Sequence, residues 1–411
     1  MKNKKLKIAV FHLAFFYSGG GEKLVLEEIK GLTKRGHEVD CFSSVVEKWI
    51  CFPDIIGKFK IKTLFPKMPK IIRRQETLEI IITCLLFPLI AWRFGKYDVI
   101  FAANQPSPWF AWWVKLFRKT PYVIYLAQPT RILYPRKIDL EKGLWVKKKV
   151  RLFPLLIKVA RPFILWVDKV SIVASDTMLV NGKYMAKILE KTYGKKAVIC
   201  PAGAHLQPKI VKNKWKGEVR ANSHKISRPY ILISNRHFPQ KKFEYALEVM
   251  PSILKENPGV SLVITGNHTS YTQQLRVLAK KLGVGKEVIF TGYVTEKDMV
   301  TLYKNVAVYV YTSPEEDFGM GVIESMAAGT PVVTWDIAGP STTIIDGKTG
   351  FLVEPYLQDE FTKKILFLLN NKAKNILMGG RAIKHVKNNY TYQKHNDVLN
   401  ETLIKAVSKL R

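Results

Sequence analysis

The sequence predicts an α/β protein made of two doubly wound domains, each built on a parallel sheet. A single hydrophobic core stops growing near about 250–300 residues, so a chain of 411 residues predicts two domains. Short, β-rich apolar runs alternate with helical stretches through both halves, as parallel sheets require. A polar, basic stretch without periodicity divides the halves at residues 207–228, and we interpret it as a linker.

The first domain is expected at residues 1–206 and opens with a β-α-β unit. Its expected strands lie at residues 6–12, 38–42, 98–102, 122–127, 170–174 and 197–200. The glycines Gly19, Gly20 and Gly21 form the turn between the first strand and the first helix, where backbone can approach a ligand closely. A plain tight turn explains these glycines equally well. The G-x-G-x-x-G spacing of dinucleotide sites is missing, which argues against an NAD enzyme.

The second domain is expected at residues 229–388. Its expected strands lie at residues 230–234, 260–265, 288–290, 306–311, 331–334 and 351–353. A last amphipathic helix follows in the C-terminal segment 389–411.

The net charge is +33, from 66 basic and 33 acidic residues, and it predicts an anionic partner. Nucleic acid is one candidate, but no zinc-finger, RNA-recognition or basic-zipper signature accompanies the charge, so none is expected. A membrane surface is the other candidate, because residues 131–169 mix Lys and Arg with Trp, Phe and Leu. An ordinary buried helix with a solvated basic face is the alternative interpretation.

A second apolar stretch, IIITCLLFPLIAW at residues 80–92, is too short to span a bilayer, which takes about 20 apolar residues, and it contains a proline. It is expected to be interfacial, re-entrant or buried. With Trp109, Phe110, Trp112 and Trp113 it predicts an apolar face rimmed by positive charge. No cleavable signal peptide is visible, and four scattered cysteines fit a reducing cytoplasm.

The stretch from residue 311 to residue 355 carries the clearest chemistry. Glu316 lies in the loop after a strand, and Glu324 lies one turn into the following helix. The loop amides and the helix N-terminus point at the same space, which suits an anion, while carboxylates accept hydrogen bonds from hydroxyls. The loop residues are Phe318, Gly319, Met320 and Gly321. The pattern therefore predicts a site for a polyol attached to a phosphate, unless the acids only cap the helix.

The run P-E-E-D-F-G-M-G-V-I-E-S-M-A-A-G-T-P-V-V resembles the nucleotide-sugar site of retaining family 4 glycosyltransferases. The resemblance implies the GT-B fold, with two Rossmann-like domains facing a cleft and a C-terminal helix returning to the first domain. It also implies that Glu316 contacts the transferred sugar and that Glu324 contacts the donor ribose. The chain departs from the family at Asp317, which is commonly Gly, and at Thr342, which is commonly Glu.

The segment N-R-H-F-P-Q-K-K, after the strand at 230–234, resembles the family's R-x-x-x-x-K motif. The resemblance assigns Arg236 and Lys241 to the diphosphate leaving group. It places Tyr293 and Val294 beside the nucleotide base. No D-x-D motif is found, and the family needs no metal and no cofactor beyond the donor.

The runs G-G-G-E-K-L-V and K-R-G-H-E-V resemble the family's opening, where the glycine turn lies between donor and acceptor. Gln128 and Arg131 are candidate acceptor contacts, with a structural proline turn as the alternative. The layout is similar to mannosyltransferases that extend lipid-linked oligosaccharides.

This similarity implies hexose transfer, with GDP-mannose favoured as donor, to a glycan or polyprenyl-linked acceptor, by a peripheral enzyme on the cytoplasmic membrane face. The alternatives are a UDP-sugar transferase with a soluble acceptor and a non-catalytic, basic nucleic-acid-binding protein on the same fold.

Overall fold

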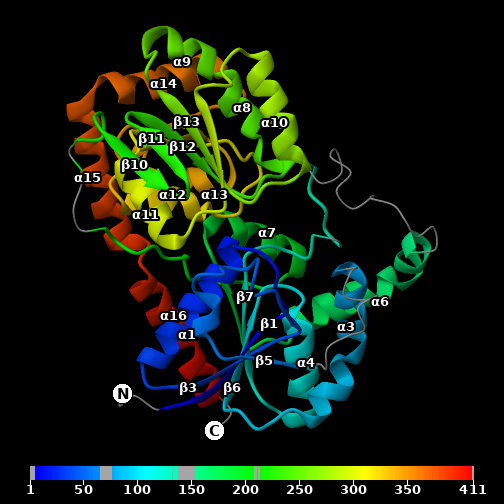
Figure 1. Ribbon diagram of the computed structural model, residues 1–411. Coiled ribbons are helices and arrows are strands. Elements are labelled where there is room, and N and C mark those ends of the chain that lie inside the picture. The colour runs from blue at the N-terminus through cyan, green and yellow to red at the C-terminus, as the bar shows by residue number, and fades with distance from the viewer. Residues whose placement is uncertain are drawn as a thin grey trace. The chain divides into compact units, whose positions relative to one another are not determined.

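The computed structural model describes residues 5–64, 76–131, 133–137, 153–207, 211 and 213–409. The chain forms two compact units (Figure 1). The N-terminal unit comprises residues 1–201 and 392–411, and the C-terminal unit comprises residues 202–391. The chain therefore passes between the units twice, at 201–202 and at 391–392.

The N-terminal unit is built on a seven-stranded parallel sheet in the order β5-β3-β1-β6-β7-β8-β9. The strands are β1 (Lys7–His12), β3 (Glu38–Ser43), β5 (Ile61–Thr63), β6 (Val99–Ala103), β7 (Tyr122–Leu126), β8 (Thr177–Val180) and β9 (Val198–Ile199). Strands β2 (Ala14–Phe15) and β4 (Val45–Val46) form a separate two-stranded parallel sheet. The chain order reverses between β1 and β6, which makes their carboxyl ends a topological switch point, the usual place for a ligand.

Helices surround this sheet: α1 (Gly20–Lys34), α3 (Glu76–Arg93), α4 (Ser107–Arg118), α6 (Phe153–Val173), α7 (Lys183–Tyr193) and α16 (Tyr392–Ser408). The predicted strand at residues 170–174 is wrong, because these residues lie in and just after the last turn of α6. β-Branched residues favour strands, but burial of Val167, Ser171 and Ile172 on one helical face overrides that preference. The strand in this part of the sheet is β8 instead.

The C-terminal unit has a six-stranded parallel sheet in the order β14-β13-β12-β15-β16-β17. Its strands are β12 (Tyr230–Ser234), β13 (Ser261–Thr265), β14 (Val288–Gly292), β15 (Val308–Tyr311), β16 (Val332–Trp335) and β17 (Gly350–Val353). Its helices are α8 (Phe243–Glu248), α9 (Met250–Glu256), α10 (Ser270–Lys281), α11 (Glu296–Asn305), α12 (Met320–Ala327), α13 (Ala338–Ser341), α14 (Gln358–Asn370) and α15 (Lys372–Asn389). The switch point of this sheet lies between β12 and β15.

The predicted linker contains regular structure. Strands β10 (Glu218–Ala221) and β11 (His224–Ser227) form an antiparallel hairpin that packs along α11. Val219, Ala221 and Ile226 face inward, so the hairpin has a period-2 pattern, but it is too short to stand out among the surrounding charges.

Lys214, from the same stretch, is fully buried. Its Nζ atom donates to the Gly329 carbonyl oxygen at 2.8 Å and to Thr330 Oγ1 at 2.6 Å, just beyond α12. Burial lowers the pKa of Lys214 from 10.5 to about 7. Between about pH 7 and pH 10.5, Lys214 is therefore protonated in the unfolded chain and largely unprotonated in the folded chain.

We expect the free energy of unfolding to rise with pH above pH 7 by up to about 1.4 kcal/mol per pH unit from this group. The Lys214→Met variant removes this contribution. Urea unfolding at pH 7, 8 and 9 measures the free energy of unfolding of the wild type and of Lys214→Met. The difference between the two proteins should change with pH. The same pH dependence in both would contradict a lowered pKa of Lys214.

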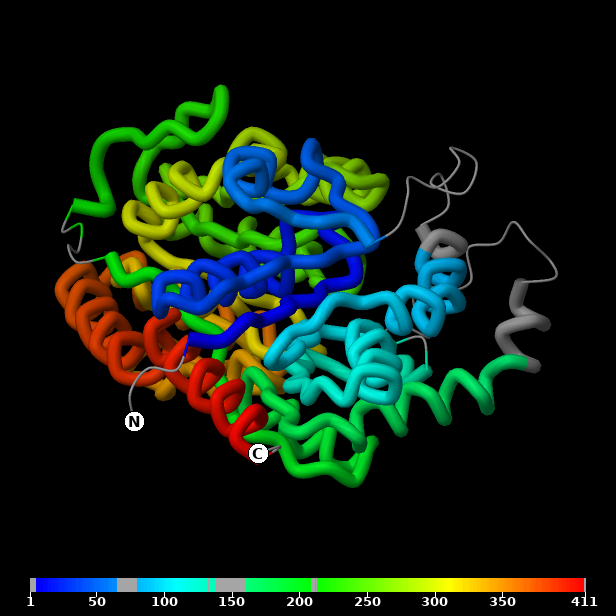
Figure 2. Tube along the Cα trace, turned by 90° about the horizontal axis from the view of Figure 1, so that it is seen from below, coloured from blue at the N-terminus to red at the C-terminus, as the bar shows by residue number. Residues whose placement is uncertain are grey.

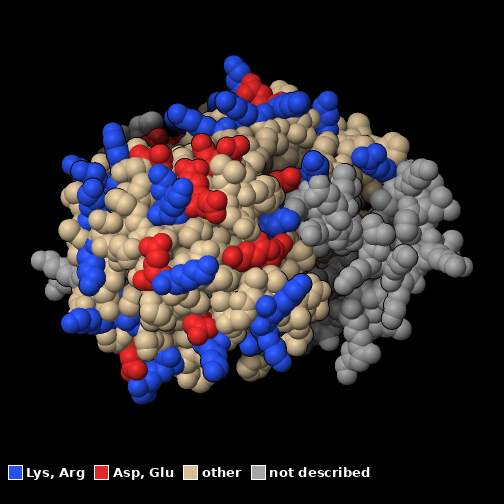
Figure 3. Space-filling view, turned by 90° about the horizontal axis from the view of Figure 1, so that it is seen from above, with Lys and Arg blue, Asp and Glu red and all other residues tan. Residues whose placement is uncertain are grey.

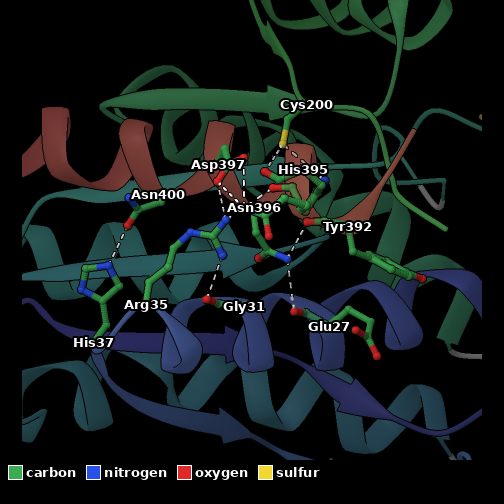
Figure 4. A network of polar contacts seen from close by, with 11 residues as sticks. Glu27, Gly31, Arg35, His37, Cys200, Tyr392, His395, Asn396, Asp397 and Asn400 are labelled. Atoms are coloured by element: carbon green, nitrogen blue, oxygen red, sulfur yellow. Dashed lines mark hydrogen bonds and ion pairs between the residues drawn. The ribbon is translucent and has the colours of Figure 1, made fainter. Parts of the chain in front are cut away.

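Helix α16 closes the N-terminal unit and lies beside α1 (Figure 1 and Figure 2). Polar contacts hold it there: Arg35 pairs with Asp397, and His37 Nε2 lies 2.6 Å from Asn400 Oδ1 (Figure 4). On the same helix His395 is buried, with Nε2 2.9 Å from Glu28 Oε1 and Nδ1 2.9 Å from the Pro201 carbonyl oxygen. Because a carbonyl only accepts, Nδ1 carries a proton. His395 thus connects Pro201, at one chain crossing, and the start of α16, near the other, to Glu28 of α1.

Candidate active site

Two loops meet at the switch point of the C-terminal unit. The loop after β12 carries Arg236 and Lys241, and the loop after β15 carries Glu316. The Thr312 hydroxyl donates to the Lys241 and Lys242 carbonyl oxygens at 3.1 and 2.9 Å, which ties the loops together. The residues predicted for diphosphate and sugar binding therefore lie at one edge of one sheet.

Glu316 is the centre of this edge. Its Oε2 atom accepts from Lys241 Nζ at 2.5 Å and from the Tyr311 hydroxyl at 2.5 Å. Asn235 Nδ2 donates to the same tyrosine oxygen at 3.0 Å. Burial and then the Glu316 charge raise the pKa of Tyr311 well above its ordinary value, so the phenol stays protonated and keeps donating. The carboxylate is thus fixed by two donors while its side chain remains 18% exposed.

Glu324 is held by a second tyrosine. The Tyr303 hydroxyl donates to Glu324 Oε2 at 3.2 Å, and Ser234 Oγ lies 2.9 Å from Tyr303 and 2.8 Å from Tyr309 at their hydroxyls. Gly321 makes this arrangement possible, because a Cβ there would lie 2.3 Å from the Tyr309 hydroxyl. The end of β12 and the first turn of α12 are therefore joined through buried hydroxyl groups.

The loop before α12 is shaped by glycine. Gly319 has a φ of +85° and caps the helix, while Met320 and Gly321 form its first turn. The N–H groups of a first helical turn have no carbonyl partner within the helix, which makes them ready donors to an anion. Phe318 is buried against Tyr390, with ring centroids 5.9 Å apart, so it supports the loop from behind.

Arg236 lies two residues after β12, with its guanidinium 5.6 Å from the Phe238 ring. Lys241 ends a short 3₁₀ turn, Pro239–Lys241. Two cations and the N-terminus of α12 thus face an edge where anionic oxygens can be neutralised. Among the residues that the structure describes, no group of three or more His, Cys, Asp or Glu side chains could hold a metal ion.

Tyr293 and Val294 follow β14, the outermost strand on this side of the sheet. Strand β13 separates β14 from β12, after which Arg236 and Lys241 lie. The hairpin fixes their loop, because Asn222 Nδ2 donates to the carbonyl oxygens of Thr291 and Tyr293. Asn222 was not predicted, because the hairpin itself was interpreted as linker.

Residues 18–207 match the family model described as Glycosyltransferase Family 4, and residues 216–385 match the model described as Glycosyl transferases group 1. The chain is a glycosyltransferase with a family 4 domain and a group 1 domain. The two matches fall on either side of residues 208–215, in agreement with two domains.

Relatives of the transferase match over nearly its whole length. The alpha-1,3/1,6-mannosyltransferase ALG2 of Dictyostelium discoideum is 24% identical, over 98% of this chain and 99% of that protein. The Neurospora crassa alpha-1,3/1,6-mannosyltransferase is 25% identical, over 90% of this chain and 85% of that protein.

Solved structures confirm the predicted GT-B fold. Sucrose-phosphate synthase from Thermosynechococcus elongatus superposes with a TM-score of 0.74 at 18% identity, over 98% of this chain and 99% of that one. Anabaena HepE in complex with UDP-glucose gives a TM-score of 0.70 at 16% identity, over 97% and 100% of the two chains.

The transferase has Thr342 where the family commonly has Glu. The Thr342 hydroxyl forms a hydrogen bond within its own turn. Thr342 Oγ1 donates to the Gly339 carbonyl oxygen at 2.7 Å at the end of α13. Gly339 N in turn donates to the Glu316 carbonyl oxygen at 2.8 Å, and a Cβ on Gly339 would lie 2.1 Å from the Asp317 carbonyl oxygen. Thr342 thus stabilises the turn that supports Glu316.

The residues predicted to face the acceptor lie in the N-terminal unit of the transferase. Gly19 is the N-cap of α1, and Gly20 and Gly21 are its first two residues, so two of the glycines expected in the turn lie in the helix. Gln128 and Arg131 lie in the loop after β7, where the Thr130 hydroxyl donates to Asp168 Oδ1 at 2.7 Å. Asp168 also accepts from Trp109 and Tyr193, so a buried carboxylate fixes this loop.

The tyrosines Tyr303, Tyr309 and Tyr311 were missed in the sequence. Tyr309 and Tyr311 alternate along β15 and so share one face, and this period-2 pattern beside an acidic loop was the available signal. Tyr303 comes from α11 and could not be associated with Glu324 without the fold.

Replacing Tyr303 by Phe is expected to raise the donor KM about 2–10-fold and leave kcat nearly unchanged, because Glu324 loses a hydrogen bond made in ground and transition states alike. Tyr230→Phe is the matched control, since its buried hydroxyl donates to the Leu302 carbonyl oxygen at 2.7 Å, away from both glutamates. Steady-state kinetics of both variants measure the difference. Equal KM values for the two variants would contradict a role for Tyr303 in the donor site.

Proposed function

We propose that this transferase moves a mannosyl residue from GDP-mannose to a glycan carried on a polyprenyl lipid, with retention of configuration and without a metal. The observation that carries the proposal is the contact of Lys241 with Glu316 at the switch point beside the N-terminus of α12. Such an edge suits a sugar joined to a diphosphate. The mannosyl donor is supported by the names of the full-length relatives, which are mannosyltransferases.

In the proposed reaction, the bond between the sugar C1 and the diphosphate oxygen breaks, and the acceptor hydroxyl forms the new bond to C1 on the same face. Arg236, Lys241 and the first amides of α12 stabilise the charge that develops on the leaving diphosphate. Glu316 orients the sugar through its hydroxyls. The departing phosphate oxygen accepts the acceptor proton, so Glu316 is not a nucleophile. Lys241 is shared between Glu316 and the diphosphate once the donor is bound.

The proposed acceptor requires a membrane surface, and the N-terminal unit has a suitable face. The apolar stretch at residues 80–92 lies in α3, where Leu85, Leu89 and Trp92 are 71%, 64% and 60% exposed at helical spacing. Phe163 and Trp166 on α6 are also exposed, and Trp166 packs on Trp112 of α4 at 5.8 Å. Much of the basic, aromatic stretch predicted at 131–169 lies outside the described residues.

No helix among the described residues is long and apolar enough to cross a bilayer. We propose peripheral binding to an anionic membrane, on its cytoplasmic face, because exposed apolar side chains on α3 and α6 occur in a chain with a net charge of +33. On the face shown in Figure 3, Lys and Arg side chains are spread out with Asp and Glu among them and do not gather in one patch. The described residues on this face therefore form no continuous basic stripe of the kind that follows a nucleic-acid backbone.

Transfer assays with the full chain test the proposal. GDP-mannose and UDP-glucose are each offered with a polyprenyl-diphosphate-linked oligosaccharide or a soluble glycoside, and NMR determines the anomeric configuration of the product. We expect α-mannosyl transfer from GDP-mannose to the lipid-linked acceptor, with EDTA present. Transfer from UDP-glucose to a soluble glycoside would replace the proposal with the alternative. Release of no nucleoside diphosphate under any condition would overturn both.

A further inference from the structure

Trp49 is 90% exposed, the most exposed of the large apolar side chains that the structure describes. Single exposed apolar residues are common and need no explanation. This one differs in where it lies and in how firmly its loop is held. It follows β4, on the side of the sheet where the carboxyl ends of the strands carry the predicted acceptor residues.

The loop at residues 47–52 is anchored at both ends. Glu47 N donates to the Phe15 carbonyl oxygen at 2.9 Å, and Cys51 N donates back to the Glu47 carbonyl oxygen at 2.8 Å. Cys51 and Phe52 are buried. The indole is therefore held out from a fixed backbone rather than from a frayed segment.

Ser18 connects this loop to the glycine turn. Its hydroxyl donates to the Ile50 carbonyl oxygen at 2.9 Å and accepts from Phe52 N at 2.8 Å. Gly19 follows directly in the chain. Trp49 thus lies on a loop fixed against the turn that the family places between donor and acceptor.

Gln105 lies two residues after β6, at the β1–β6 switch point. Both atoms of its amide group, Oε1 and Nε2, are buried and have no hydrogen-bond partner among the described residues. The neighbouring Asn104 approaches Gly21, where a Cβ would lie 3.4 Å from Asn104 Nδ2. A buried amide without partners is costly, and a ligand that offers both a donor and an acceptor removes the cost.

We propose that Trp49 and Gln105 bind the glycan of the acceptor, an inference that rests on the proposed transferase function. The face of a pyranose ring presents C–H groups with partial positive charge, which suit the negative face of an indole. Neighbouring sugar hydroxyls both donate and accept, as the Gln105 amide does. The acceptor is therefore recognised by a sugar ring at this edge as well as by its lipid, and Trp49 and Gln105 determine acceptor specificity.

The test compares Trp49→Ala, Trp49→Tyr and Gln105→Ala with Leu377→Ala, an exposed apolar residue on α15 that serves as the control. At saturating donor, Trp49→Ala is expected to raise the acceptor KM about tenfold or more, Gln105→Ala severalfold, and Trp49→Tyr much less. The donor KM stays unchanged in all of them. Leu377→Ala is expected to leave both the acceptor KM and co-sedimentation with vesicles of phosphatidylcholine and phosphatidylglycerol unchanged.

Calorimetric titration with mannobiose, cellobiose and chitobiose separates this inference from the transfer reaction, because it needs neither donor nor turnover. Binding of at least one disaccharide by the wild type and its loss in Trp49→Ala support the subsite even if the donor is not GDP-mannose. An unchanged acceptor KM in Trp49→Ala overturns the inference. Loss of vesicle binding in that variant, with disaccharide binding intact, reassigns the indole to the membrane surface.

Discussion

Replacing Glu316 with Ala is expected to lower kcat about 100–1000-fold. The Glu316 carboxylate accepts hydrogen bonds from both Lys241 and Tyr311, and in the proposed reaction its loss leaves the transferred sugar without its orienting acceptor. Glu316→Gln keeps an acceptor for Tyr311 but removes the charge that pairs with Lys241, so we expect an intermediate loss. Initial rates of nucleoside diphosphate release at saturating donor measure both.

Tyr311→Phe is the control for this experiment, because it removes one donor to Glu316 and leaves the carboxylate in place. Its kcat should fall less than that of Glu316→Ala. If Glu316→Ala retained a third or more of the wild-type kcat with an unchanged melting temperature, Glu316 would not orient the sugar.

Replacing Lys241 with Ala is expected to cost about 100–1000-fold in kcat, with Arg236→Ala close behind, because each removes a cation from the leaving diphosphate. Lys242→Ala is the matched control: it is the next residue, carries the same charge, and its Nζ lies 3.8 Å from Glu244 Oε1 instead of at the site. Its kcat should stay within about twofold, the usual range for a surface ion pair.

The double variant Lys241→Ala/Glu316→Ala should lose much less than the product of the two single losses, because the two groups act as a unit. Equal losses in Lys241→Ala and Lys242→Ala would show that overall charge, and not the site, controls the rate.

The sheets could be predicted from the sequence because their strands are short apolar runs separated by turn residues. The strand at residues 230–234 was placed with its correct bounds for this reason. The run at residues 170–174 failed because its β-branched residues pack as a helix against the sheet, a tertiary effect that local preference does not show. The hairpin at residues 218–227 failed because only three of its side chains are buried.

The site was predicted in part, from motifs that are local in the chain. Lys241 and Glu316 were assigned to diphosphate and sugar separately, and only the fold brings them into contact across 75 residues. Tyr303 supports Glu324 from a different helix, and Asn222 supports the Tyr293 loop from a hairpin, so neither could be predicted without knowledge of the sheet order. The role of Thr342 in its own turn was also visible only in three dimensions.

Titration calorimetry of GDP and UDP against the wild type, Lys241→Ala and Lys242→Ala tests the central claim most directly. The claim is that the switch point between β12 and β15 binds a nucleoside diphosphate. We expect one of the two nucleotides to bind the wild type at a single site, binding at least tenfold weaker in Lys241→Ala, and unchanged binding in Lys242→Ala. No binding of either nucleotide, or equal binding to all three proteins, would contradict it.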